Sequence, residues 1–188
     1  MTADALQALQ LPRQGTTLVV VDVQERLVQA MPAPVYRQVL ANIQLLRQAA
    51  GLLDLPVLTT EQYPRGLGPT VAELRGGQTV EKITFGCCGE PAFLKALSAL
   101  QTRRVLLVGM EAHVCVYQTV LGLRQAGLGV HLIQDAICSQ RKGDYRAALH
   151  NAAQAGAVLS TTEMALFQLL ERAGTAEFKT VSALIKAR

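Results

Sequence analysis

The stretch RVLLVGMEAHVCVYQTV, residues 104–120, decides the fold of this chain. It begins with a continuous apolar run, which is typical of a strand covered on both faces of a sheet. It ends with Val116 and Val120 on one helical face, which Leu123 continues and Gly127 stops. Cys115 lies where the predicted strand gives way to the helix. The stretch therefore predicts a strand, a turn and a helix, with a thiol at the turn.

Five other β-rich runs lie on either side of this unit, at residues 16–23, 56–62, 79–83, 129–136 and 157–163. Helical stretches at residues 34–54, 90–101, 144–156 and 161–174 lie between or after them. Strands that alternate with helices favour a parallel sheet with right-handed crossovers. We predict a single α/β domain with a six-stranded parallel sheet and helices on both faces, in a Rossmann-like arrangement. Residues 1–15 form an N-terminal extension and residues 174–188 a C-terminal tail.

Composition narrows the class of protein. The chain has 188 residues, half of them hydrophobic, and a formal charge of +4 spread over scattered Lys and Arg. No basic stripe interleaves with aromatic residues, so we expect no nucleic-acid partner. No apolar run approaches the ~20 residues that a spanning helix needs, so we expect no membrane association and a cytoplasmic location. Four cysteines in a chain of this size are expected to be reduced thiols.

Three reactive side chains fall at or just after predicted strand ends. Asp22 closes LVVVD, Lys82 lies late in TVEKI, and Cys115 follows LLVGM. Each has a structural alternative: a helix cap for Asp22, a solvated strand end for Lys82, and inert core for Cys115. In an open parallel sheet, however, ligands bind beyond the carboxyl ends of the strands. We therefore predict that the three groups meet in one site.

These three residue types complement one another chemically. A carboxylate within reach of a thiol accepts its proton and later returns it to a leaving group. A neighbouring ammonium keeps the carboxylate ionised and favours the thiolate, which is the nucleophile. The turn MEAH adds backbone N–H groups suited to an oxyanion hole. The pattern therefore predicts nucleophilic catalysis by Cys115.

Other kinds of site are not supported. His113 and Cys115 are two residues apart and do not face each other on a helix. Cys87 and Cys88 are adjacent, and the chain has no CxxC pair and only three histidines, so we expect no metal. No GxGxxG follows the first strand, so we expect no dinucleotide and no other cofactor.

The long connection at residues 61–78, EQYPRGLGPTVAELRGGQ, is rich in glycine and proline. It is predicted to be a binding loop, either a lid over the site or a subunit contact. Tyr63, Phe85 and His113 are candidates to close over a small substrate. The alternative is a surface loop held by its prolines.

The chain resembles the isochorismatase-like cysteine hydrolases over nearly its whole length. The resemblance rests on LVVVDVQERL, VEKITFGC and GMEAHVCVYQT, in that order, and TEQYPRGLG and DAICSQR extend it towards the isochorismatase domain-containing subgroup. It implies a catalytic triad of Asp22, Lys82 and Cys115 on a Rossmann-like sheet. It also implies a cis peptide bond at Met110–Glu111, with the Glu111, Ala112 and Cys115 amides aimed at one oxygen.

The resemblance also sets limits on the chemistry. Nicotinamidases hold a metal near the triad through an aspartate and histidines, whereas DVQER here has Gln24, a candidate substrate-binding residue, and no histidine close by. Isochorismate hydrolases, which cleave a vinyl ether, lack the cysteine that is present here. Relatives of this kind usually assemble, so a homo-oligomer, a dimer or tetramer, is expected.

We therefore predict a metal-independent cysteine hydrolase that acts on a small amide or related acyl substrate through a thioester. Two alternatives stay open. One is vinyl-ether hydrolysis that uses Asp22 as the acid without Cys115. The other is a catalytically silent binding or scaffold protein of the same fold.

Overall fold

The computed structural model describes residues 3–188 and contains one six-stranded, fully parallel sheet with the strand order β3-β2-β1-β4-β5-β6. This confirms the predicted fold class. The strands are β1 (Thr16–Val21), β2 (Val57–Gln62), β3 (Gln78–Lys82), β4 (Arg104–Met110), β5 (Gly129–Cys138) and β6 (Val158–Ser160). Only β6 is clearly shorter than predicted, because the Thr161 side chain accepts a hydrogen bond from the Met164 N–H and starts a helix there.

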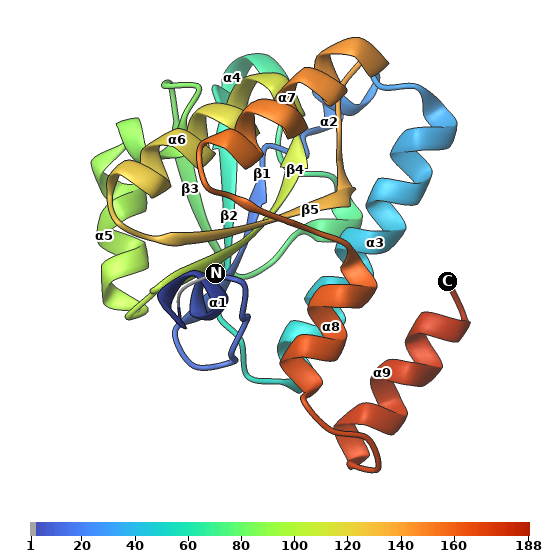
Figure 1. Cartoon of the computed structure of the whole chain (residues 1–188). Helices are drawn as coiled ribbons and strands as arrows, with labels where there is room; N and C mark the ends of the chain where they lie inside the picture. Colours follow the sequence, from blue (N-terminus) through green and yellow to red (C-terminus); the bar gives the residue numbers. More distant parts are fainter. Residues whose placement is uncertain (1–2) are drawn as a thin grey trace.

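Helices cover both faces of the sheet, as Figure 1 shows. The α-helices are α1 (Ala3–Ala8), α2 (Glu25–Val28), α3 (Ala33–Leu52), α4 (Pro64–Leu67), α5 (Pro91–Ala99), α6 (Tyr117–Gln125), α7 (Lys142–Gln154), α8 (Thr162–Leu170) and α9 (Ala176–Lys186). Three further turns are helical: η1 (Ala72–Leu74), η2 (Cys87–Gly89) and the π-type turn η3 (Ala112–Val116). One apolar core packs α3, α8 and α9 on the sheet, and a second packs α5, α6 and α7 on the other face.

The centre of the sheet places the site. β1 pairs with β2 on one side and β4 on the other, and all six of its residues are buried. The chain leaves β1 at Asp22 and leaves β4 towards Cys115, so both residues lie at the carboxyl edge. The connections from these two strands run in opposite directions across the sheet, and a crevice at such a point is where open α/β sheets bind ligands.

The segment just before β1 and the helix α9 both pack on the domain. Val181 of α9 is fully buried, and Phe178, Leu184 and Ile185 pack against the same core. Arg13 pairs with Glu177 at 3.1 Å and donates to the Leu169 carbonyl at 2.6 Å. The predicted C-terminal tail is therefore a packed helix, whose apolar face is used within the chain.

Residues 1 and 2 of the predicted N-terminal extension lie outside the described residues. From residue 3 onward, no helix combines the length and the apolar character needed to cross a membrane.

Candidate active site

A buried ion pair forms the centre of the candidate site. The Lys82 Nζ lies 2.6 Å from the Asp22 Oδ2, and both side chains are fully inaccessible to solvent. The Thr60 hydroxyl donates to the other carboxylate oxygen, Oδ1, at 2.7 Å. Asp22 follows β1 with a left-handed φ of 51°, and it does not cap the next helix, whose N-cap residue is Gln24. The structure thus places Asp22 and Lys82 together, as the sequence predicts.

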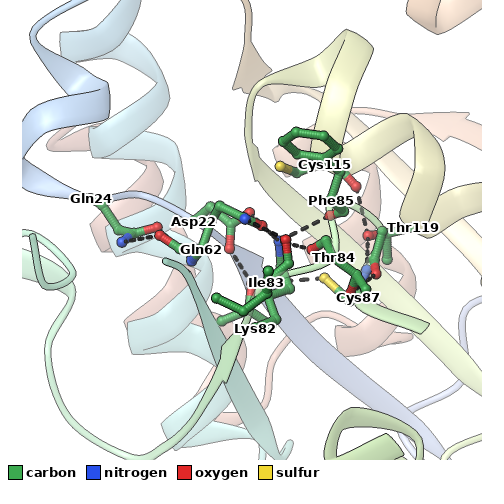
Figure 2. A network of polar contacts seen from close by, with 12 residues as sticks. Asp22, Gln24, Gln62, Lys82, Ile83, Thr84, Phe85, Cys87, Cys115 and Thr119 are labelled. Carbon is green, nitrogen blue, oxygen red and sulfur yellow. Dashed lines mark hydrogen bonds and ion pairs between the residues drawn. The ribbon is translucent and has the colours of Figure 1, made fainter. Parts of the chain in front are cut away.

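The ammonium group of Lys82 has acceptors on every side (Figure 2). Besides Asp22, it donates to the Gln62 Oε1 at 2.8 Å, to the Phe85 carbonyl at 2.9 Å and to the Thr84 carbonyl at 3.2 Å. Burying a charge is costly unless it is paired and hydrogen-bonded. These acceptors meet that requirement, and they hold the ammonium against the Asp22 carboxylate.

Cys115 lies in η3, between β4 and α6, and is 5% exposed. Burial raises the pKa of its thiol, the Asp22 carboxylate raises it further, and the Lys82 ammonium lowers it by less, so the net pKa is well above the ordinary value. The sequence-based expectation that the surroundings favour a thiolate is therefore wrong for the free protein. Lys82 does act in the expected direction, but desolvation and the carboxylate outweigh it.

Thr119 connects Cys115 to a neighbouring segment. Its hydroxyl donates to the Cys115 carbonyl at 2.6 Å and accepts the Cys87 N–H at 3.0 Å. The Cys87 thiol, which is fully buried, contacts the Thr60 hydroxyl at 3.8 Å. Thr60, Gln62 and Thr119 escaped the sequence analysis because such residues are common in strands and helices. For Thr60 and Gln62 the sequence held one signal: they are two residues apart on β2, so their side chains lie on the same face of the sheet, opposite to that of Glu61.

The turn before the cysteine has the backbone feature that the resemblance implies, since the Met110–Glu111 peptide bond is cis. Met110 and Ala112 are buried. The Glu111 carbonyl accepts the N–H groups of Val114 and Val116, and its side chain accepts the Gln140 N–H at 2.8 Å. These contacts fasten the start of η3 to the end of β5.

The four predicted substrate-binding residues differ in their surroundings. Gln24 is fully buried, and its amide donates to the carbonyls of Gln62 and Gly68 and accepts the Gln62 N–H. We assign it to positioning, because its hydrogen-bonding groups are used inside the protein. His113 contacts the Ser139 hydroxyl at 3.0 Å through Nδ1. Tyr63 and Phe85 are exposed.

The connection at residues 61–78 is hydrogen-bonded to the rest of the domain. It contains α4 and η1, and its ends belong to β2 and β3. Gln24 and Arg26 donate to the carbonyls of Gly68 and Gly66 at 2.7 Å each. Glu61 accepts both the N–H and the hydroxyl of Thr70. These bonds hold the segment in place, and they favour a fixed connection over a hinged lid.

Metal-binding side chains do not gather anywhere in residues 3–188: no group of three or more His, Cys, Asp or Glu is placed to hold an ion. All four cysteines are free thiols. What the arrangement offers chemically is a thiol, a carboxylate and an ammonium at one point, with the start of a helical turn beside them.

A doubly wound α/β domain with these groups at its carboxyl edge defines the class of the protein. The chain belongs to the isochorismatase family, because the Isochorismatase domain model matches residues 16–164. This confirms the family that the motifs indicate.

Relatives support the same assignment. Isochorismatase domain-containing protein 2 of Bos taurus is 42% identical over 80% of this chain and 74% of its own. Isochorismatase domain-containing protein 2A of Mus musculus is 38% identical over 92% of this chain and 84% of its own.

Solved structures of similar fold include the MAR1 ribonuclease from Caenorhabditis elegans, with a TM-score of 0.87 and 34% identity over 94% of this chain and 92% of that one. YcaC from Escherichia coli, an octameric hydrolase of unknown specificity, has a TM-score of 0.83 and 23% identity, covering 93% of this chain and 90% of that one. At that identity the likeness concerns the fold alone.

Proposed function

We propose that the protein is a metal-independent cysteine hydrolase that cleaves a small amide or related acyl compound through a thioester. The observation that carries this proposal is the buried Asp22–Lys82 pair, 2.6 Å apart, beside the thiol of Cys115. A buried charge pair is expensive and adds little to stability. Here the pair has a chemical purpose, because it places a proton acceptor next to a nucleophile.

In the first half of the reaction, the Cys115 Sγ attacks the substrate carbonyl carbon while Asp22 takes the thiol proton. The negative charge that forms on the carbonyl oxygen is held by backbone N–H groups of Glu111, Ala112 and Cys115. The C–N bond then breaks, and the amine leaves with the proton from Asp22. The product of this half is a thioester on Cys115.

In the second half, Asp22 takes a proton from a water molecule, which attacks the thioester carbonyl. The C–S bond breaks, the carboxylic acid leaves, and the sulfur recovers its proton. Lys82 holds the Asp22 carboxylate in place between the steps, when it must act as a base. The Lys82 ammonium and the backbone amides supply the positive charge that a metal would otherwise provide.

The test is a panel of small primary amides assayed for ammonia release, with Cys115→Ala and Asp22→Asn beside the wild type. We expect both variants to lose at least about a thousandfold in turnover, and rapid quenching to trap an acyl group on Cys115. Cys88→Ser is the matched control, because Cys88 is half-buried and burial alone accounts for the raised pKa of its thiol.

Two outcomes would contradict the proposal. Activity that survives in Cys115→Ala but is lost in Asp22→Asn would support a hydrolysis that uses Asp22 without Cys115, the kind of chemistry that vinyl-ether hydrolysis needs. Binding of ligands with no turnover in any variant would support a silent binding protein.

A further inference from the structure

The only cation paired with Asp22 among the described residues is already fully used. An ammonium group has three N–H donors, and Lys82 Nζ has four acceptors within 3.2 Å, all belonging to the protein. Lys82 therefore has no donor left for a substrate. It is a positioning residue for Asp22, and it does not bind an anionic group of the substrate.

The surroundings of the nucleophile disfavour additional negative charge. The Asp22 carboxylate and burial together raise the pKa of the Cys115 thiol, and Lys82 offsets only part of this effect. A substrate carboxylate near the sulfur meets the same two penalties: it loses water, and it faces Asp22.

Three exposed apolar side chains belong to residues whose backbones contact Lys82 or Gln62. Tyr63, Ile83 and Phe85, here called the apolar rim, are 51%, 69% and 55% exposed. The backbone of each is hydrogen-bonded to Lys82 or to Gln62, whose side chain accepts from the Lys82 ammonium. The Tyr63 N–H donates to the Lys82 carbonyl, the Ile83 carbonyl accepts the Gln62 side chain, and the Phe85 carbonyl accepts the Lys82 ammonium.

The segment that carries Phe85 also packs on the helix that follows Cys115. Gly86 follows Phe85, and a Cβ at Gly86 would lie 3.2 Å from Gln118 of α6, so the chain after Phe85 packs directly on that helix. Gln118 is three residues after Cys115. The chain at Phe85 and Gly86 therefore runs from the Lys82 ammonium to α6, the helix that follows η3 and Cys115.

We propose that the substrate is an uncharged acyl compound with an apolar acyl group, which binds on the rim of Tyr63, Ile83 and Phe85. This rests on the proposed function, because it takes Cys115 as the acyl acceptor. Exposed apolar side chains gain free energy when a ligand covers them. The rim can supply this free energy to a bound substrate, whereas Lys82 cannot form a salt bridge with it.

The first test compares p-nitrophenyl butyrate with p-nitrophenyl hemisuccinate, two esters whose acyl groups differ chiefly in a terminal carboxylate. The Cys115 sulfur forms the C–S bond, the ester C–O bond breaks, the thiol proton passes to Asp22, and nitrophenolate is released and measured. Each rate is divided by the rate of the same ester with free cysteine. We expect the neutral ester to be favoured by about tenfold or more, since a like charge near Asp22 is repelled.

The second test uses p-nitrophenyl acetate, butyrate and hexanoate with rim variants. In the wild type the acylation rate should rise with chain length, by up to about fourfold per added CH₂ group. Phe85→Ala and Ile83→Ala should flatten this rise. Met164→Ala is the control. Met164 is 54% exposed, and its helix α8 packs on the face of the sheet opposite to that of Cys115.

Three results would overturn the inference. One is equal acylation by the neutral and anionic esters, and another is a chain-length dependence that the rim variants leave intact. The third is a rim variant that changes the mass in solution and not the chain-length dependence, which would make the rim a contact with a second copy. The proposed function fails on a different readout, namely acylation that persists in Cys115→Ala.

Discussion

At the scale of single residues, Lys82 is the most informative side chain. It is 2% exposed, although lysine is rarely buried. Its acceptors come from the ends of β1 and β2 and from the segment just after β3. Apolar residues of the same volume would often serve stability as well as a buried ion pair does. The charge is therefore best explained by the chemistry of its neighbours, Asp22 and Cys115.

The two charges of the pair should shift the reactivity of Cys115 in opposite directions. Asp22 raises the pKa of the thiol and Lys82 lowers it. In Asp22→Asn the pKa falls, so more thiolate is present at a given pH and iodoacetamide labels Cys115 at lower pH. In Lys82→Met the pKa rises and labelling moves to higher pH. Mass spectrometry of the labelled cysteine against pH measures both shifts.

Stability has to be followed in the same experiment, because breaking a buried pair costs about 3–5 kcal/mol. Circular dichroism at the labelling temperature shows whether each variant is folded. Turnover should be lost in both. Shifts of the labelling profile in the same direction for both variants would contradict the assigned electrostatics.

His131 on β5 is fully buried, and burial lowers its pKa to about 4, helped by the charge of Arg104 and opposed by the Gln10 carbonyl. The unfolded chain binds this proton below about pH 6.5 and the folded chain only below about 4, so stability falls as the pH drops between them. We expect His131→Leu to remove about 3 kcal/mol of that acid sensitivity. Urea unfolding of the wild type and of His131→Leu at pH 7 and pH 4.5 tests this. If both proteins lost the same free energy of unfolding between the two pH values, the expectation would be refuted.

At the scale of elements, the closeness of β1 and β4 sets the position of Asp22. Gly109 of β4 has a φ of 118°, and a Cβ there would lie 2.1 Å from the Val21 carbonyl oxygen. Val21 is the last residue of β1 and directly precedes Asp22. Only glycine allows this approach. The β4–β5 register also shifts between Leu107 and Gly109, so the end of β4 is locally irregular.

Gly109→Ala should therefore lower the free energy of unfolding by about 3 kcal/mol or more, through a clash and an unfavourable φ. It should also displace Asp22 and reduce turnover more than the stability loss alone explains. Gly143→Ala is the control: nothing lies within 4 Å of its Cβ, and it is inside α7, so it should stabilise by about 0.5–1 kcal/mol. Chemical denaturation measures both, and similar values for the two would contradict this account.

At the scale of the whole molecule, the two apolar cores lie on opposite faces of one sheet, and the site belongs to one of them. Cys115 and Cys87 are in the core with α5, α6 and α7, whereas α9 closes the other core with α3 and α8. The C-terminal helix therefore contributes to the stability of the domain from the face opposite the site (Figure 1).

Val181→Asp tests whether α9 is part of the core on the face opposite the site. An unpaired charge at a fully buried position should unfold the domain or lower its melting temperature steeply. Ala183→Asp, two residues away at an exposed position of α9, should change stability by no more than about 0.5 kcal/mol. Calorimetry compares them. If both variants melt like the wild type, α9 is not part of the core.

Periodicity and order along the chain were enough to predict much of this protein. Apolar runs such as LVVV and VLLV can only be buried in a sheet covered on both faces, so the alternation of strands and helices indicated the fold. Strand ends in a parallel sheet share one edge, so the meeting of Asp22 and Lys82 followed from position alone. The family followed from three motifs in a fixed order.

The tertiary structure alone decided what surrounds those residues. The four acceptors of Lys82 come from three separate segments, and the amide of Gln24 is used internally through Gln62 and Gly68, which lie far away in the sequence. The pKa of Cys115 depends on how completely water is excluded and on how two opposite charges compare at the sulfur. Such quantities are sums over contacts that folding creates, so no local pattern in the sequence could have carried them.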